Sequence, residues 1–137
     1  MLRAASFTLR AAHQSRLAFS QGCSAGARAF STANTDKVVT ATVENFDEHL
    51  NSEGLVIVDF TAEWCPPCRM LGPVLKSVVP ENGGKLIIVD TDDSPEIATR
   101  YSISSLPTVL AFREGKRLGA FVGAQPASFV QDFMKKY

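Results

Sequence analysis

Apolar and polar positions alternate along this chain with two periodicities, one typical of strands and one typical of helices. Residues 38–43 are rich in β-branched side chains, which predicts a strand. Residues 44–50 place Phe46 and Leu50 four positions apart, which predicts a short helix with one apolar face. Residues 55–60 are almost continuously apolar and favour a central strand that is covered on both faces.

The second half of the chain continues this alternation. Residues 66–79 have apolar residues at helical spacing, and Pro73 inside them predicts a kink. The other predicted elements are strands at 86–89, 108–112 and 117–122, a short helix capped by Ser94, a hairpin turn at Glu114–Gly115, and a helix at 126–136. The order βαβαβαββα predicts an α/β fold with a central mixed five-stranded sheet flanked by helices, parallel at first and antiparallel in the closing hairpin.

Composition and charge narrow the class of protein. A chain of 137 residues with 45% hydrophobic and 20% charged residues is ordinary for one globular domain. Its longest apolar runs have four residues, as at 55–58, against the roughly 20 that a membrane-spanning helix needs. Residues 36–137 hold 10 basic and 14 acidic residues, a net charge of −4, which argues against a nucleic-acid partner. We therefore expect no membrane or nucleic-acid partner. We also expect a monomer, although nothing in the composition or charge decides the oligomeric state.

Residues 1–33 have the composition of an organellar targeting segment, rich in Ala, Ser and Arg. Arg3, Arg10 and Arg16 interrupt every apolar stretch, so the apolar core of about 7–15 residues that a secretory signal needs is missing. We expect import into the mitochondrial matrix. A disordered tail without function and a plastid address stay open as alternatives.

Residues 28–31 resemble the pattern at which mitochondrial presequences are cleaved, with an aromatic residue before a small one. This predicts a mitochondrial targeting presequence at residues 1–30 and a single domain at residues 31–137. Cleavage there would remove Cys23 and leave the mature chain with two cysteines.

The two remaining cysteines lie where the strand at 55–60 gives way to the helix at 66–79. Cys65 occupies the N-terminus of that helix, where the positive end of the helix dipole lowers the pKa of a thiol and produces an attacking sulfur. Cys68 follows one turn later, within reach of Cys65 for a disulfide, and we expect it to be more buried. One sulfur would attack and the other would resolve.

Other functions of such a cysteine pair, metal binding and a structural disulfide, are less well supported by the sequence. Two cysteines at this spacing also begin zinc and iron–sulfur sites, but zinc takes four ligands. The mature chain adds only His49, which is distant in sequence and expected to be structural, so a metal would require a cluster shared by two chains. A purely structural disulfide would close too short a loop to gain much entropy. We therefore expect no metal.

A longer stretch around the cysteines resembles a known family. Residues 58–70, VDFTAEWCPPCRM, followed by Pro73, are similar to the active-site segment of the thioredoxin family. Residues 105–108 are similar to the cis-proline loop of that family, and residues 121–124 to the glycine-bearing edge of its substrate groove. The resemblance covers residues 38–137 and implies the thioredoxin fold.

This resemblance implies a role for each residue of the site. Cys65 would be the nucleophile, Cys68 the resolving cysteine that forms a disulfide with it, and Asp59 the proton acceptor and donor for Cys68 through water. A lone carboxylate in an apolar strand is unfavourable to bury ionised, so the pKa of Asp59 should be raised. The substrate-binding residues that the resemblance implies are Trp64, Pro66, Pro67, Leu106, Pro107, Thr108, Gly123 and Ala124.

Plainer interpretations of these residues stay open. Trp64 could be a core aromatic, and Asp59 could be a solvent-facing residue at a frayed strand end. Pro107 could be an ordinary proline at the first residue of a strand. Gly123 and Ala124 could be turn residues with no other role.

Two departures from the usual pattern of the family matter. Pro66 and Pro67 replace Gly-Pro and carry no N–H donors, which changes the reduction potential in a direction that the sequence leaves open. Residues 87–89 lack the lysine that bacterial members place near the buried aspartate, so we expect Asp59 to be harder to ionise.

The sequence therefore predicts a protein-disulfide reductase that works by dithiol–disulfide exchange in the mitochondrion. The resemblance implies that it needs no bound cofactor and receives electrons from NADPH through its partner, thioredoxin reductase. It also implies disulfide-containing clients such as peroxiredoxins, while glutathione as the reductant stays open. A more oxidising isomerase or oxidase, and a non-catalytic binding module, are the alternative functions.

Overall fold

The computed structural model describes residues 36–137. The presequence expected at residues 1–30, with its cleavage pattern and Cys23, lies outside the described residues. The elements are β1 (Val38–Thr40), α1 (Phe46–Leu50), β2 (Leu55–Thr61), α2 (Pro66–Glu81), β3 (Lys85–Asp90), α3 (Pro95–Arg100), β4 (Thr108–Arg113), β5 (Lys116–Val122) and α4 (Ala127–Lys135). The predicted order βαβαβαββα is confirmed. Among these helices, none is both long and apolar enough to cross a membrane.

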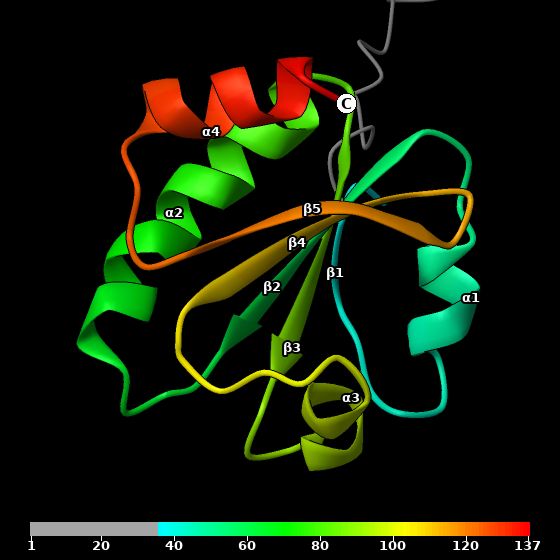
Figure 1. Ribbon diagram of the computed structural model, residues 1–137, viewed down its shortest axis with the longest axis vertical. Coiled ribbons are helices and arrows are strands. Elements are labelled where there is room, and N and C mark those ends of the chain that lie inside the picture. The colour runs from blue at the N-terminus through cyan, green and yellow to red at the C-terminus, as the bar shows by residue number, and fades with distance from the viewer. Residues whose placement is uncertain (1–35) are drawn as a thin grey trace, which may run out of the picture.

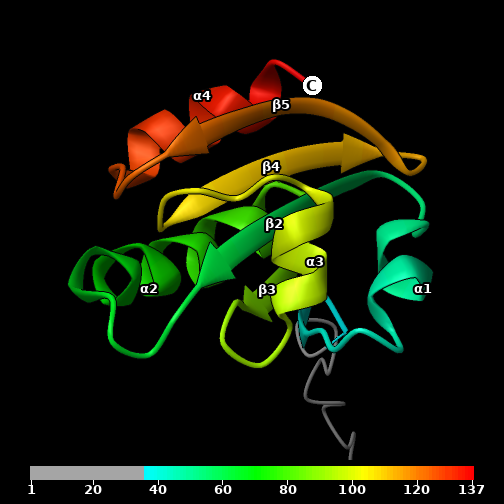
Figure 2. The same ribbon diagram turned by 60° about the horizontal axis from the view of Figure 1, so that its bottom comes forward.

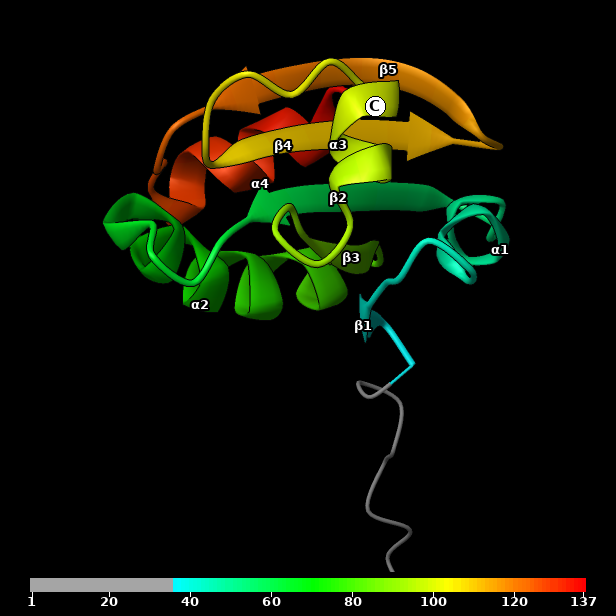
Figure 3. The same cartoon turned by 90° about the horizontal axis from the view of Figure 1, so that it is seen from below.

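The strands form one mixed five-stranded sheet in the order β1-β3-β2-β4-β5. β1 and β2 both run parallel to β3, whereas β4 runs antiparallel to β2 and β5 antiparallel to β4. Figure 3 shows the strands in this order, from β5 at the top to β1. A shift of register interrupts the pairing of β4 with β5 at Ala111 and Phe112, next to the closing hairpin. The sheet thus has β1 and β5 at its edges and β2 at its centre.

The central strand β2 is buried on both faces and divides the core in two. Val56, Val58 and Phe60 pack in the cluster that contains residues of α1 and α3, whereas Ile57 packs with α2 and α4. Figures 1 and 2 show the same division, with α2 and α4 on one side of the sheet and α1 and α3 on the other. Because successive side chains of a strand point to opposite faces, Asp59 lies on the face of Ile57, which α2 covers.

The first strand is shorter than the predicted range 38–43. β1 ends at Thr40, and the carbonyl of Thr42 accepts hydrogen bonds from the N–H groups of Asn45 and Phe46 at 3.3 and 3.0 Å. The N–H of Thr42 in turn donates to the Asn45 side chain at 2.8 Å. This turn removes the end of the predicted strand from the sheet, because its hydrogen-bonding groups are used locally.

Candidate active site

The end of β2 and the start of α2 bring two cysteines together. Cys65 has an extended backbone and directly precedes α2, and Cys68 lies in the first turn of that helix. The two form a disulfide with their Cα atoms 5.3 Å apart. Each is about 3% exposed, so the expectation that Cys68 is the more buried of the two is wrong for this oxidised form. Ala62 and Leu106 pack in one cluster with both cysteines and exclude solvent from each.

Pro66 and Pro67 fit the first turn of α2. The first N–H groups of a helix have no partner within it, so proline removes no helical hydrogen bond there. The helix ladder begins when the N–H of Arg69 donates to the carbonyl of Cys65 at 3.3 Å. No acidic residue lies in this first turn. The positive end of the helix dipole acts on Cys65 at this position, an arrangement that favours a thiolate.

Arg69 holds the loop that precedes Cys65, a role that the sequence analysis missed. Its Nε and Nη2 atoms both donate to the carbonyl of Glu63, at 3.0 and 2.6 Å. The N–H of Cys65 donates to the carbonyl of Ala62 at 3.2 Å in the same loop. The signal in the sequence is a cation directly after the second cysteine, but its acceptor is a backbone atom that no side-chain pattern reveals.

Trp64 is a surface residue, which overturns its interpretation as a core aromatic. Its side chain is 66% exposed, and its Nε1 donates to Asp92 Oδ2 at 2.8 Å. The N–H of Asp92 donates in turn to Asp90 Oδ1 at 2.9 Å. This chain of contacts positions the indole beside the disulfide. The sequence analysis did not identify Asp92, which lies 28 positions from Trp64.

Asp59 is buried within the sheet, so its interpretation as a solvent-facing strand end is wrong. The residue is 3% exposed and pairs with Ile88 of β3 and Val109 of β4. Its Oδ1 atom has no hydrogen-bond partner among the described residues. Burial raises the pKa of Asp59 to about 7, and the positive charge of Lys76 partly opposes this rise. A carboxyl with such a pKa can both accept and donate a proton near neutral pH.

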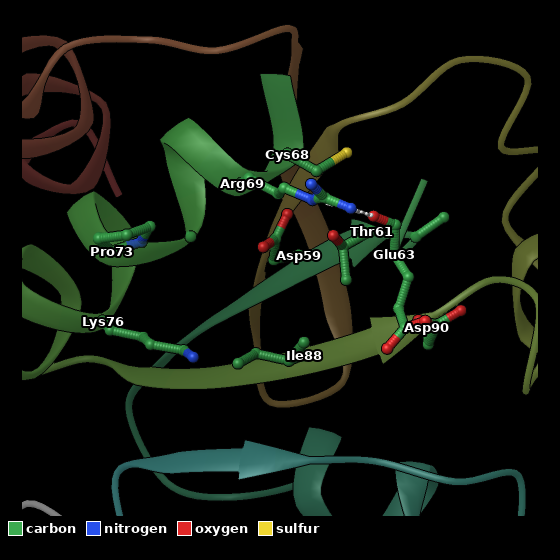
Figure 4. Close-up of a pocket in the computed structure, with 11 residues that line it drawn as sticks. Asp59, Thr61, Glu63, Cys68, Arg69, Pro73, Lys76, Ile88 and Asp90 are labelled. Atoms are coloured by element: carbon green, nitrogen blue, oxygen red, sulfur yellow. Dashed lines mark hydrogen bonds between the residues drawn. The ribbon is translucent and has the colours of Figure 1, made fainter. Parts of the chain in front are cut away.

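A cavity of about 520 Å³ connects Asp59 with Cys68. Asp59 and Cys68 both line it, together with Lys76 and Arg69 of α2 and Asp90 of β3 (Figure 4). The cavity has both polar and apolar lining residues and is large enough for several water molecules, with Asp59, Glu63 and Asp90 among the polar partners. Proton transfer between Cys68 and Asp59 through water is therefore sterically possible.

The loop before β4 lies on the other side of the cysteines. The peptide bond between Leu106 and Pro107 is cis, as the resemblance implies. The carbonyl of Pro107 accepts a hydrogen bond from the N–H of Gly123 at 2.8 Å, and the hydroxyl of Thr108 donates to the carbonyl of Ser105 at 2.6 Å. Gly123 has φ of +90°, which favours glycine over any residue with a Cβ atom. The loop before β4 and the residue after β5 are thus joined by a direct hydrogen bond.

Several large apolar side chains are exposed on the segments around the disulfide, beside charged residues such as Arg69 and Asp92. Trp64, Met70 and Val122 are 66, 72 and 56% exposed, although residues of these types are usually buried. Ala124 and Pro66 are also exposed, whereas Pro107 and Thr108 are buried. The structure therefore surrounds a reactive sulfur pair with an apolar rim, an arrangement suited to binding another protein.

His49 and the possibility of a metal can be judged on the described residues. His49 is half-buried, and its Nδ1 lies 3.2 Å from Nζ of Lys85, away from the cavity residues. Within residues 36–137, no group of three or more His, Cys, Asp or Glu side chains is placed to hold a metal ion.

Comparisons with known proteins agree with this geometry. The family model described as Thioredoxin matches residues 37–136. The chain is 44% identical over 90 residues to the chloroplastic M-type thioredoxin of Spinacia oleracea, covering 64% of this chain and 50% of that protein. It is 44% identical over 92 residues to the mitochondrial thioredoxin of Bos taurus, covering 66% and 55%. The chain thus spans about half the length of these two curated relatives.

A further relative and two solved structures extend this result. A thioredoxin of Porphyra purpurea is 40% identical over 92 residues, covering 66% of this chain and 86% of that protein. A mutant thioredoxin from Halobacterium salinarum NRC-1 superposes with a TM-score of 0.70 at 26% identity, covering 74% of this chain and 91% of the other. The reduced thioredoxin pre-protein of Schistosoma mansoni gives 0.66 at 32% identity, covering 74% and 98%.

Proposed function

Because the chain belongs to the thioredoxin family, we propose that it is a thiol–disulfide oxidoreductase that reduces disulfides of other proteins through Cys65 and Cys68. The observation that carries this proposal is the cysteine pair, able to form a disulfide, at the N-terminus of α2 beside an exposed apolar rim. No bound cofactor is required, because the two sulfur atoms hold the two electrons that are transferred.

The first step is an attack of the Cys65 thiolate on one sulfur of a client disulfide. A new bond forms between Cys65 Sγ and that client sulfur, the client S–S bond breaks, and the other client sulfur leaves as a thiolate that takes a proton. We propose that an extended client segment lies along the backbone of Leu106 and Thr108, with contacts from Trp64 and Gly123. Extended peptides bind in this way by adding to exposed backbone groups.

The second step releases the client. Cys68 transfers its proton towards Asp59 through the cavity, and the resulting thiolate attacks Cys65 Sγ. The mixed disulfide breaks, the Cys65–Cys68 bond forms, and the second client sulfur leaves and takes the proton. In total the client gains two electrons and two protons, and the dithiol of this protein becomes a disulfide.

A reductant must then return two electrons to the disulfide. We propose NADPH as the source and a thioredoxin reductase as the partner, with disulfide-forming proteins such as peroxiredoxins among the clients. The apolar rim with exposed Trp64 and Met70 supports docking of protein partners. Addition of NADPH with either a thioredoxin reductase or glutathione and its reductase, followed by NADPH absorbance, distinguishes the two reductants.

We also propose that the protein works in the mitochondrial matrix, with a presequence at residues 1–30 and the working domain at residues 31–137. Relatives named as mitochondrial and as chloroplastic both support an organelle. The arginine-rich composition before residue 34 favours mitochondrial import. Import of the full chain into isolated mitochondria, with the new N-terminus sequenced after protease treatment, tests both the compartment and the cleavage near Ser31.

The decisive test is the reduction potential of the Cys65–Cys68 couple, measured against a defined thiol buffer with Cys23 replaced by serine. A value near the roughly −270 mV of thioredoxin supports the reductase, whereas a value near about −180 mV supports an isomerase or oxidase. One specific observation favours the isomerase or oxidase: Pro66 and Pro67 offer no N–H donors to the Cys65 thiolate. A chain without any reversible couple would leave only a binding module.

A further inference from the structure

The buried carboxyl of Asp59 has no cation beside it in the sheet. Its partners across the two neighbouring strands are Ile88 and Val109, which are uncharged. Residues 87–89 of the neighbouring strand β3 contain no lysine. A positive charge that acts on Asp59 must therefore come from the helix that covers this face of the sheet.

The ionisable groups that line the cavity come from three places. Glu63 follows β2, and Asp90 ends β3. α2 contributes Arg69 and Lys76 besides Cys68, and β4 contributes no lining residue. Apart from the cysteine, the cavity thus holds Asp59 and two further carboxylates against two cations. Which of the two cations acts on Asp59 depends on what else each one binds.

Arg69 is already engaged elsewhere. Its guanidinium donates two hydrogen bonds to the carbonyl of Glu63, which directs its charge to the loop before the cysteines. Lys76 forms no hydrogen bond or ion pair with any residue from 36 to 137. Figure 4 shows its side chain extending from α2 along the pocket that Asp59 also lines, with the ammonium group directed towards Ile88. Lys76 is therefore the cation that is free to act on Asp59.

The local sequence of α2 explains why Lys76 reaches the cavity. Side chains of a helix lean towards its N-terminus, so a lysine covers the position four residues earlier on the same face. That position is Gly72, which lines the cavity and has open space where a Cβ atom would lie. The lysine stem can pass over this glycine without obstruction and carry its charge towards Asp59.

We propose that Lys76 is a positioning residue for the redox cycle, whose ammonium group reaches over Gly72 and stabilises the Asp59 carboxylate, thereby setting the pH range in which Cys68 loses its proton. The proposal rests on the proposed function, since it concerns the resolving step of that cycle. Its sign follows from electrostatics, because a nearby positive charge favours the ionised form of a carboxyl. The pKa of Asp59 agrees with this sign, because Lys76 lowers it whereas burial raises it.

The test replaces Lys76 in the full chain with Cys23→Ser as the background. Lys76→Met removes the charge and Lys76→Arg retains it, while Lys116→Met makes the same change at an exposed lysine of β5 that does not line the cavity. Lys76 is itself exposed, so its replacement leaves the core intact. Two readouts are needed: the Asp59 carboxyl titration followed by NMR, and the pH profile of client release from the mixed disulfide.

We expect Lys76→Met to move both midpoints upward by about half a pH unit, the size that Coulomb's law gives for unit charges several Å apart in a water-like medium. Lys76→Arg and Lys116→Met should both match the parent protein. Unchanged midpoints in Lys76→Met, or an equal shift in Lys116→Met, would overturn the proposal. A parent protein that forms no mixed disulfide would instead refute the proposed function, and the NMR titration would still decide the role of Lys76.

Discussion

The buried carboxyl of Asp59 should make the protein less stable as the pH rises. Its pKa is raised from 3.8 to about 7 by burial, so the folded protein holds a proton that the unfolded chain has already lost between these values. Stability falls with pH wherever the folded state binds more protons than the unfolded state. The contribution of the neutral carboxyl is therefore complete below about pH 4, is lost as the pH rises to 7, and changes little above it.

The substitution Asp59→Asn removes this pH dependence while keeping the size of the side chain. A difference between pKa values of 3.8 and about 7 corresponds to about 4 kcal/mol of unfolding free energy. We therefore compare the unfolding free energies of the oxidised Asp59→Asn and parent proteins. Relative to the parent, the unfolding free energy of Asp59→Asn should increase by about 4 kcal/mol as the pH is raised from 4 to 8. The gain comes from avoiding a buried negative charge whose Oδ1 has no partner among the described residues.

Guanidinium unfolding of both oxidised proteins at several pH values between 4 and 8 measures this difference. Asp93→Asn is the matched control, because Asp93 is exposed and lies outside the cavity. A difference between Asp59→Asn and the parent that stays constant across this pH range would refute the reasoning. The same variant should slow client release from the mixed disulfide, since it has no carboxyl to accept the Cys68 proton.

Three other substitutions test separate parts of the site. Asp92→Ala removes the acceptor of the Trp64 indole, and we expect the KM for a protein disulfide to rise roughly fivefold, as for one lost hydrogen bond; an unchanged KM would contradict this role. Arg69→Met removes two hydrogen bonds to the Glu63 carbonyl and should lower the unfolding free energy in urea by about 1–2 kcal/mol, with Arg69→Lys intermediate. Leu75→Ala opens the core and should cost about 2–5 kcal/mol in the same assay, while the reduction potential stays that of the parent.

Hydrophobic periodicity was sufficient to predict the order of the elements, because each helix buries an apolar face and each strand an apolar segment whose pattern is visible in the sequence. The almost continuously apolar stretch at 55–60 predicted the central strand β2, and the structure buries it on both faces. The end of β1 was wrong because Thr42 and Asn45 form a turn through backbone and amide groups. Such local hydrogen bonds compete with a strand without changing its apolar pattern.

The cysteines and Asp59 could be identified from the sequence of residues 55–79 alone, because the predicted strand and helix in this segment determine their positions. The contacts that other residues make around this site could not be identified from the sequence, because these contacts join residues that are far apart in the chain. Trp64 meets Asp92 only because β2 and β3 pair side by side. Lys76 could not be identified in this way, because it reaches Asp59 from α2 and not from the strand that pairs with β2.

The two edges of the sheet differ in a way that bears on self-association. An exposed edge strand offers unpaired backbone groups to a second chain, and short strands, cations and bulges discourage this. β1 has only three residues. β5 begins with exposed Lys116 and Arg117, and its pairing with β4 is shifted at Ala111 and Phe112. Edge-to-edge stacking of copies is therefore disfavoured at both margins, and concentrated solutions of the folded protein should resist fibrillar aggregation.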